Sequence, residues 1–245
     1  KSKIIEHLSQ RNKDSEMYRN LRFEIEENKK VKIKNIQFVG NNSYSNLRLK
    51  WKMKNIKPQR WLFFWRDSFD EKKMTEDQEL VSKFYRNNGY RDFNFIMDTL
   101  EYSDDKTKMN IKMKVSEGEQ YKYRNFSWEG MSLFNENQLK MKLGLESGDV
   151  YREDQFNMAV FSGVQGLYLD KGYIYSKIDP QITPISKDSL DIHFVITENH
   201  KVFINNIAIK GNTRTRENVI RRQLRIFPGD VYNQERISRS YREVM

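Results

Sequence analysis

The sequence contains no cysteine among its 245 residues, which excludes disulfide bonds, thiolate metal sites and cysteine nucleophiles. It also has no run near the roughly 20 apolar residues that a membrane-spanning helix needs, since its longest strongly apolar run is Trp61 to Trp65. Charge is plentiful, because 44 Lys+Arg against 34 Asp+Glu give a net charge of +10. With 37% hydrophobic and 13% aromatic residues, the composition indicates a soluble basic chain with several small cores.

Signals of enzyme chemistry are missing as well. Neither the phosphate-binding pattern G-x-x-x-x-G-K-[ST] nor the nucleophile pattern G-x-S-x-G occurs. The three histidines, His7, His193 and His200, are not spaced as metal ligands, and His193 falls on the polar side of an alternating segment. The sequence therefore predicts a protein that is not an enzyme, and we expect no cofactor and no metal.

Three segments of the chain open in the same way: VKIKNIQFVGN at Val31, YKYRNFSWEGM at Tyr121 and VFINNIAIKGN at Val202. Their spacings of 90 and 81 residues also relate three alternating triplets. The triplets are Leu21, Phe23 and Ile25; Ile111, Met113 and Val115; and Ile192, Phe194 and Ile196. Alternation with a period of two predicts strands with one buried face, and the polar turn before each triplet makes it the second arm of a hairpin.

Helical signals lie between each opening strand and its hairpin. In the second complete repeat a short helix is predicted to begin at Asn135 and end near Gly144, and a longer one is predicted from residue 152 to about residue 169. Gly172 follows the longer helix, where a positive φ favours glycine. The repeat is therefore β-α-α-β-β, an α+β fold with a three-stranded mixed sheet backed by two helices.

The repeats divide the chain into four parts. Residues 1–30 hold the hairpin half of a preceding unit, and residues 31–118 form a complete unit with an aromatic-rich insertion. Residues 119–200 form a second complete unit, and residues 201–245 hold the opening strand and helices of a further one. The first residues lack the apolar core of a signal peptide and a start methionine, so we expect a targeting segment upstream.

The repeats resemble POTRA domains, the periplasmic modules of BamA-like outer-membrane β-barrel assembly proteins. The resemblance covers nearly the whole chain. It rests on an opening I-x-F-x-G-N pattern, a G-D-x-Y turn at Gly148 and Gly229, and a Y-x-x-x-G-Y helix end at Tyr85 and Tyr168. The opening pattern is carried by Ile36, Phe38, Gly40 and Asn41, and again by Ile207, Ile209, Gly211 and Asn212. Met131 departs from it, and the insertion within residues 57–92 resembles that of relatives from Bacteroidetes-like bacteria.

The resemblance implies a scaffold at the periplasmic face of the outer membrane. POTRA arrays receive unfolded outer-membrane proteins from periplasmic chaperones and dock accessory outer-membrane lipoproteins. They precede a C-terminal β-barrel, which is not present in this chain. The POTRA region of a related translocation or autotransporter-assembly protein is the alternative within the family.

A sheet edge offers a physical route to client binding. In a mixed sheet of this type the last strand is central and the preceding strand lies at an edge, where an extended client can add through backbone hydrogen bonds. The edge segment 175–185 contains Pro180 and Pro184, which remove donors and protect an edge. The equivalent segment of the first complete unit has no proline, and an ordinary edge strand is the alternative interpretation. We expect clients to pair with Phe93, Asn94, Phe95, Ile96, Met97, Asp98 and Thr99.

The aromatic run in the insertion is a second candidate site. Five consecutive large apolar residues seldom fit one face of a helix or strand, so some are expected to be exposed. Arginines flank the run and can meet anionic headgroups while the rings lie at a membrane surface. Packing into the core of the unit is the alternative. The residues assigned to partner or membrane-surface docking are Arg60, Trp61, Phe63, Phe64, Trp65 and Arg66.

The net charge also raises a nucleic-acid hypothesis, supported chiefly by Arg214, Arg216, Arg221, Arg222 and Arg225. If these residues are helical, four of them share a broad face. Basic residues are nevertheless spread through every repeat, and no helix-turn-helix, zinc spacing or RNP motif occurs. The sequence favours a solvated face or a lipoprotein-binding surface, and no nucleic acid is expected as a partner.

Overall fold

The computed structural model describes residues 4–13, 16–25, 31–56, 69–105 and 107–245, with the backbone alone up to residue 25. The chain divides into two compact units. The first comprises Lys1–Val81 and Asn94–Ser116, and the second comprises Ser82–Phe93 and Glu117–Met245. In the described part of the chain, no helix has both the length and the apolar character that a bilayer span requires.

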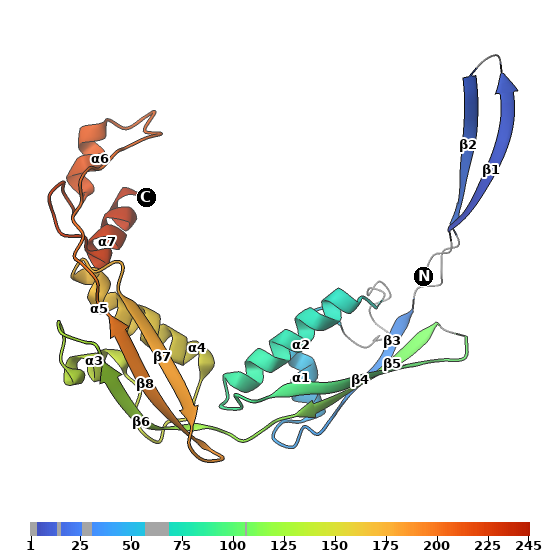
Figure 1. Cartoon of the computed structure of the whole chain (residues 1–245), viewed down its shortest axis with the longest axis horizontal. Helices are drawn as coiled ribbons and strands as arrows, with labels where there is room; N and C mark the ends of the chain where they lie inside the picture. Colours follow the sequence, from blue (N-terminus) through green and yellow to red (C-terminus); the bar gives the residue numbers. More distant parts are fainter. Residues whose placement is uncertain (1–3, 14–15, 26–30, 57–68, 106) are drawn as a thin grey trace. The chain divides into compact units, whose positions relative to one another are not determined.

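An antiparallel hairpin precedes the first sheet. β1 (Ile4–Lys13) pairs with β2 (Glu16–Ile25) in unbroken register, from Ile4 opposite Ile25 to Lys13 opposite Glu16 (Figure 1). The backbone of these residues thus forms the hairpin that their polar turn and alternation predict.

The sheet of the first unit has the order β3-β5-β4. β3 (Lys32–Val39) runs parallel to β5 (Lys108–Ser116), and β4 (Asn94–Tyr102) pairs with β5 in the antiparallel sense. Two helices, α1 (Asn46–Lys52) and α2 (Glu71–Arg86), come between β3 and β4 in the chain (Figure 1). The prediction that the last strand of a complete repeat is central is confirmed for this repeat.

One face of this sheet builds the core of the first unit. On β5, Ile111, Met113 and Val115 are buried, whereas Lys112 and Lys114 between them are exposed. A strand alternates its side chains between two faces, so the apolar triplet meets the helices and the lysines meet solvent. The alternation read from the sequence therefore assigned each face correctly.

A buried carboxylate closes the end of α1. Asp77 of α2 is fully buried and accepts the backbone N–H groups of Lys54 at 2.7 Å, Asn55 at 3.0 Å and Ile56 at 2.6 Å. Backbone N–H groups in the segment that follows a helix are costly when buried without partners. Asp77 satisfies three of them and fixes the segment that follows α1.

The second unit repeats this topology. β6 (Lys122–Glu129), β7 (Lys177–Pro184) and β8 (Ser189–Thr197) form a sheet of order β6-β8-β7, with β8 parallel to β6 and antiparallel to β7. Its core is rich in aromatic rings: Trp128 stacks on Phe194 with the ring centroids 4.2 Å apart. The remaining buried aromatic residues are Tyr121, Tyr123, Phe126, Tyr151, Phe156 and Tyr168.

The short helix of the second unit matches its prediction. α3 (Glu136–Leu143) begins with a capping box, in which the Asn135 side chain accepts the Gln138 N–H and the Gln138 side chain accepts the Asn135 N–H. Gly144 ends the helix with a φ of 62°, a conformation that favours glycine.

The longer helix differs from its prediction. The sequence predicts one helix over residues 152–169, whereas the structure contains α4 (Glu153–Met158), the π-helical segment η1 (Ala159–Val164) and α5 (Gln165–Asp170). Gly163 explains the approach of α3 to η1, because a Cβ there would lie 2.4 Å from the carbonyl oxygen of Lys142. A π-turn in one helix is not signalled by the spacing of its apolar residues.

Residues 202–245 contain α6 (Glu217–Gln223) and α7 (Gln234–Val244). The opening strand predicted at Val202 is reduced to a single bridge between Phe203 and Val231. In the other repeats the opening strand is held by the ladder of a central strand, and residues 202–245 include none. The prediction of a strand here is therefore wrong for the described structure.

Candidate functional site

β4 lies at an edge of the first unit's sheet, with β5 as its hydrogen-bonded neighbour (Figure 1). No proline interrupts it. Three of its large hydrophobic side chains are exposed, namely Ile96 (55%), Met97 (58%) and Tyr102 (52%). Proteins usually protect sheet edges with proline, charge or short strands, because an edge can pair with another chain. β4 is therefore the candidate site for pairing with an extended segment.

A β-bulge limits the length of this edge. The register with β5 shifts between Phe95 and Met97, so Ile96 has no partner on β5. Residues 97–102 then pair without interruption, from Met97 opposite Lys114 to Tyr102 opposite Met109. Because a bulge bends its strand and disrupts the ladder, the regular part of the edge begins at Met97.

Phe93 does not belong to this edge, and its assignment as a client-pairing residue needs correction. It precedes β4, is only 6% exposed, and stacks on Tyr85 with the ring centroids 4.0 Å apart. Its N–H donates to the Tyr90 carbonyl at 3.3 Å. An apolar residue at the start of an alternating run looks like strand in the sequence, yet here its ring fills the core. The remaining six candidates, Asn94, Phe95, Ile96, Met97, Asp98 and Thr99, all lie in β4.

β7 is the corresponding edge of the second sheet, and it carries both predicted prolines. Pro180 lies opposite Phe194 and Pro184 lies opposite Leu190, and the register with β8 has no shift. Proline has no N–H to give to a ladder, so its nitrogen in a sheet normally faces the open side of an edge strand. This edge therefore lacks donors that β4 retains.

The second candidate site falls outside the described residues. This applies to every residue assigned to partner or membrane-surface docking, namely Arg60, Trp61, Phe63, Phe64, Trp65 and Arg66.

Two of the sequence motifs meet in the second unit. The carbonyl of Gly89, at the Y-x-x-x-G-Y helix end, accepts the Tyr121 N–H at 2.9 Å. The Tyr121 carbonyl in turn accepts the N–H of Tyr151, the last residue of a G-D-V-Y turn, at 2.9 Å. The same two bonds recur from Val202 to Gly172 at 2.9 Å and from Tyr232 to Val202 at 3.0 Å. The helix end and the turn therefore hold the start of each following repeat between them.

The tyrosine of the helix-end motif reaches a glutamate that precedes the next repeat. Tyr85 donates to Glu117 at 2.7 Å, and Tyr168 donates to Glu198 at 3.1 Å. The sequence repeats both residue types but gives no sign that they are bonded. In each repeat this hydrogen bond joins the end of the long helix to the residues that follow the central strand.

Glu198 also accepts the backbone N–H groups of Ser132 at 2.8 Å and Leu133 at 3.0 Å. Partial burial opposes its ionisation, but the donors outweigh this effect and the pKa of Glu198 is lowered. Burial, together with the Glu198 charge, raises the pKa of Tyr168. The glutamate is therefore held as a carboxylate.

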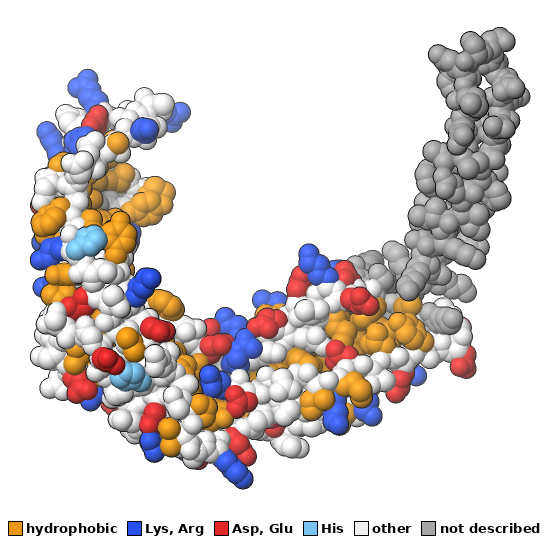
Figure 2. All heavy atoms as spheres, in the orientation of Figure 1, with side chains coloured by type: hydrophobic (Ala, Val, Ile, Leu, Met, Phe, Trp, Pro, Cys, Tyr) orange, Lys and Arg blue, Asp and Glu red, His pale blue; other side chains and the backbone are white. Residues whose placement is uncertain are grey.

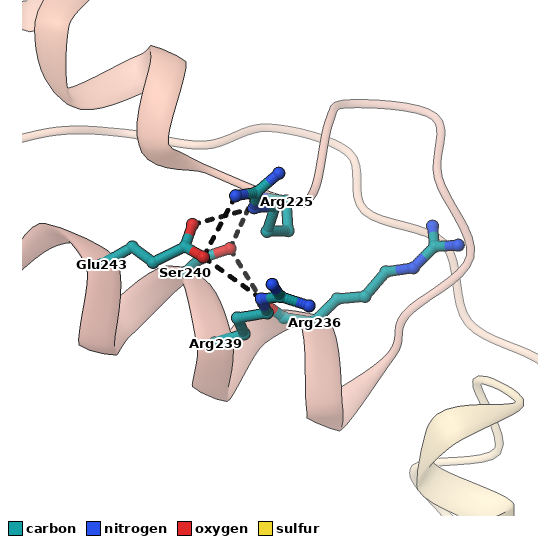
Figure 3. Close-up of polar contacts among 5 residues, drawn as sticks. All are labelled: Arg225, Arg236, Arg239, Ser240 and Glu243. Atoms are coloured by element: carbon teal, nitrogen blue, oxygen red, sulfur yellow. Dashed lines mark hydrogen bonds and ion pairs between the residues drawn. The ribbon is translucent and has the colours of Figure 1, made fainter.

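The arginine face that a single continuous helix would produce is not present. Arg214 and Arg216 precede α6, and Arg225 follows its C-cap, where the backbone is extended. Arg225 instead binds Glu243 of α7 through Nε at 2.8 Å and Nη2 at 3.1 Å, and its backbone N–H donates to Ser240 at 2.7 Å (Figure 3). The condition for such a face, one continuous helix, is not met, because α6 ends before Arg225.

His193 lies on the outer face of the second sheet. Its Nδ1 is 2.8 Å from Ser127 Oγ and its Nε2 is 3.2 Å from Glu129 Oε2. Ser127 and His193 are direct neighbours on β6 and β8, so this is a cross-strand surface pair. Within the described ranges, no group of three or more His, Asp or Glu residues is arranged for a metal ion.

Comparison with known proteins relates these features to a family. The POTRA family model, described as a surface antigen variable number repeat, matches residues 31–118, 121–199 and 202–244. The chain belongs to the POTRA family. This confirms the resemblance seen in the opening, turn and helix-end motifs, and the β-α-α-β-β architecture agrees with it.

The POTRA chain is 34% identical over 223 residues to the outer membrane protein assembly factor BamA of Neisseria meningitidis, covering 90% of the chain and 28% of that relative. It is 25% identical over 229 residues to a putative outer membrane protein assembly factor of Treponema pallidum, covering 91% and 27%. The chain therefore spans less than a third of either relative. A Bacteroidetes-like source stays a prediction.

A solved structure shows the same fold. The crystal structure of Haemophilus influenzae BamA POTRA3-5 superposes with a TM-score of 0.66 at 22% identity, covering 87% of this chain and 84% of that one. At this identity the likeness concerns the fold alone.

Proposed function

We propose that this chain is the periplasmic POTRA region of an outer-membrane protein assembly factor, and that it acts as a binding scaffold without enzymatic activity. The proposal is supported by membership of the POTRA family and by similarity to proteins named outer membrane protein assembly factors. Its expected partners are unfolded outer-membrane proteins, accessory outer-membrane lipoproteins and periplasmic chaperones.

We assign client binding to β4, in particular to residues 97–102. The observation that carries this assignment is the contrast between two equivalent edges. β4 pairs with β5 on one side and exposes Met97 and Tyr102, whereas β7 carries Pro180 and Pro184. A client that adds to β4 would bind through its backbone, which suits a scaffold that must accept many sequences.

The two edges correspond residue by residue, which provides a sharp test. Pro180 pairs with Phe194 and Asp98 pairs with Met113, and these two partners occupy the same position of the central strand. Pro184 and Tyr102 correspond in the same way. The double variant Asp98→Pro/Tyr102→Pro therefore gives β4 the proline pattern that the fold already accommodates in β7.

The test measures binding of a ten-residue peptide with the alternating apolar and polar residues of a barrel strand. Amide NMR shifts of the whole chain would report both affinity and location. We expect shifts along residues 97–102, and about tenfold weaker binding by the double-proline variant, because two backbone donors and their geometry are lost.

A control separates the edge from a side-chain effect. Asp98 accepts a hydrogen bond from Gln78 at 2.7 Å, which the double variant also removes. Asp98→Ala removes that bond and keeps the backbone donor, so it should bind the peptide nearly as well as the wild type. Unchanged binding by the double-proline variant, or shifts confined to other strands, would contradict the assignment. An oligonucleotide titrated in parallel tests the nucleic-acid alternative.

A further inference from the structure

The outer face of the first sheet, on the side away from its helices, is cationic. On β5, Lys108, Lys112 and Lys114 alternate with buried residues and are exposed, and Lys32 of β3 lies beside Lys108 in the register. Glu101 of β4 is the acidic residue on this face. Within the part of the chain that the structure describes, neither Lys112 nor Lys114 forms an ion pair. Where Figure 1 places β4 and β5, Figure 2 shows Lys or Arg and hydrophobic side chains next to one another.

Two of these lysines lie on β5, directly opposite residues of β4, the strand that forms the open edge. Lys114 pairs with Met97 and Lys112 pairs with Thr99, and neither partner on β4 is charged. A strand added to β4 would lie about 4.8 Å beyond it, roughly 10 Å from β5. The flexible four-carbon stem of lysine can lie across a small neighbour such as Thr99 and bring its ammonium group toward the side chains of the added strand on that face.

The other face of the same edge carries two hydrophobic residues, Leu100 and Tyr102, together with Asp98, which accepts a hydrogen bond from Gln78. Leu100 and Tyr102 pair with the buried residues Ile111 and Met109, so they share the helix side of the sheet. Leu100 is half-buried and Tyr102 is exposed. Alternate residues of an added strand would therefore lie beside Met97, Thr99 and Glu101 on the face that carries the lysines, and beside Asp98, Leu100 and Tyr102 on the other.

The equivalent face of the second sheet does not share this charge. His193 and Val195 occupy the positions of Lys112 and Lys114, and Val195 has Glu129 and Asp179 as its two cross-strand neighbours. The fold therefore does not require lysines at these positions. Their presence in the first sheet is a property of that face alone.

We infer that Lys112 and Lys114 select the client strand by charge, favouring amphipathic β-strands with Asp or Glu on the face that meets the lysines. This inference rests on the proposed pairing of clients with β4. It also fixes the parity of the pairing, because a slip by one residue would turn the acidic side chains to the face of Leu100 and Tyr102 and the apolar ones to the lysines. Opposite charges attract and like charges repel across this two-strand spacing, more weakly than between directly neighbouring strands.

The experiment compares three strand peptides that share their apolar residues and carry Glu, Gln or Lys at every alternate position. Affinities for the whole chain are measured by NMR titration at low and at physiological salt. We expect the Glu peptide to bind best and the Lys peptide worst, with about two- to fivefold between successive peptides. The order should reverse in Lys112→Glu/Lys114→Glu, and salt should reduce the differences.

A matched variant tests whether the effect is local. Lys142→Glu/Lys171→Glu makes the same change in net charge at two exposed lysines of the second unit. It should keep the wild-type order of the peptides. An equal reversal in this variant would overturn the inference, because the order would then follow the total charge.

Other outcomes separate the two proposals. If all three peptides bind equally well and Asp98→Pro/Tyr102→Pro still weakens binding, the edge assignment stands and charge selection fails. If the double-proline variant binds every peptide normally, the edge assignment itself fails. If Lys112→Glu/Lys114→Glu weakens binding of vesicles with anionic lipids and leaves the peptide order unchanged, the lysines serve a membrane surface and the inference is overturned.

Discussion

Asn87 and Asp154 exchange two hydrogen bonds. The backbone N–H of Asp154 donates to Asn87 Oδ1 at 2.8 Å, and Asn87 Nδ2 donates to the Asp154 carboxylate at 2.8 Å. Asp154 lies in the first turn of α4, whose own N-cap residue, Arg152, makes no side-chain capping bond. The end of α2 therefore supplies the cap for the next repeat's helix.

A related bond occurs one repeat later, although α7 also has a side-chain cap of its own from Asn233. The Glu235 N–H, in the first turn of α7, donates to Asp170 Oδ1 at 2.9 Å. Asn233 Nδ2 also donates to the Asp170 carbonyl at 2.8 Å. A cap supplied by the preceding repeat is thus a recurring element of this array, and it lies beside the bonds that link Gly172, Val202 and Tyr232.

Removal of this cap should destabilise α4 locally. Asn87→Ala leaves an N–H of the first turn without its acceptor, and we expect a loss of about 1 kcal/mol, as for other N-caps. Hydrogen exchange should show faster exchange of the Asp154 amide, with little change in the sheet of the second unit. Asn137→Ala, at an exposed position of α3, is the matched control and should leave that amide unchanged. Equal exchange rates in both variants would contradict the capping role.

Local pattern was sufficient for part of this structure. The alternation of Ile192, Phe194 and Ile196 placed the central strand, because one face of that strand is buried and the other is not. Asn135 and Gly144 marked the ends of α3, since caps depend on residues close in sequence. The repeats added what no single segment contains, namely that the last strand is central and the one before it lies at an edge.

What the sequence missed depends on contacts between distant residues. Asn87 and Asp154 are 67 residues apart, and Asn is common in turns for many reasons, so nothing marked this pair. The π-helical segment contains Gly163, whose backbone lies close to the Lys142 carbonyl oxygen. Phe93 fills the core although it begins an apolar run. Such features are set by the packing of elements, which periodicity along one element cannot reveal.

Acid should weaken the second unit through Glu198. Its pKa is lowered in the folded protein because backbone and side-chain donors outweigh the cost of partial burial. The stabilisation by this carboxylate is therefore fully present above the ordinary glutamate pKa and is lost as the pH falls through the lowered value. We expect Glu198→Gln to cost about 1 kcal/mol at neutral pH, a partly exposed site giving less than a buried one.

The measurement is urea unfolding at pH 7 and near pH 3, combined with NMR titration of the carboxyl groups. The difference in unfolding free energy between wild type and Glu198→Gln should narrow as the pH falls from the ordinary glutamate pKa through the lowered one, because the carboxylate of the wild type is then progressively protonated. Glu119→Gln, at an exposed position, should change little at either pH. If the difference in unfolding free energy between wild type and Glu198→Gln did not change with pH, the charge of Glu198 would not be the source of the stabilisation.

Removal of the prolines from β7 should open a second edge. Pro180→Asp/Pro184→Tyr gives this strand the residues that β4 carries at the same positions, and it restores two backbone donors. We expect a strand peptide to produce new amide shifts along β7, and the variant to self-associate more readily at high concentration. Light scattering and peptide titration together would check this. If the peptide causes no amide shifts along β7 of this variant, the prolines are not what prevents pairing at this edge.

Two glycines of the long helix should respond to alanine in opposite directions. A Cβ at Gly163 would lie 2.4 Å from the Lys142 carbonyl oxygen, which belongs to the backbone and cannot turn aside, whereas a Cβ at Gly166 meets nothing within 4 Å. Gly163→Ala should therefore lower the free energy of unfolding by about 1–3 kcal/mol as α3 is pushed away. Gly166→Ala should raise it by up to about 1 kcal/mol, because alanine is the better helix former. Denaturant unfolding of the two variants measures both effects, and similar changes in the two would mean that the close approach of α3 to η1 does not determine the residue at position 163.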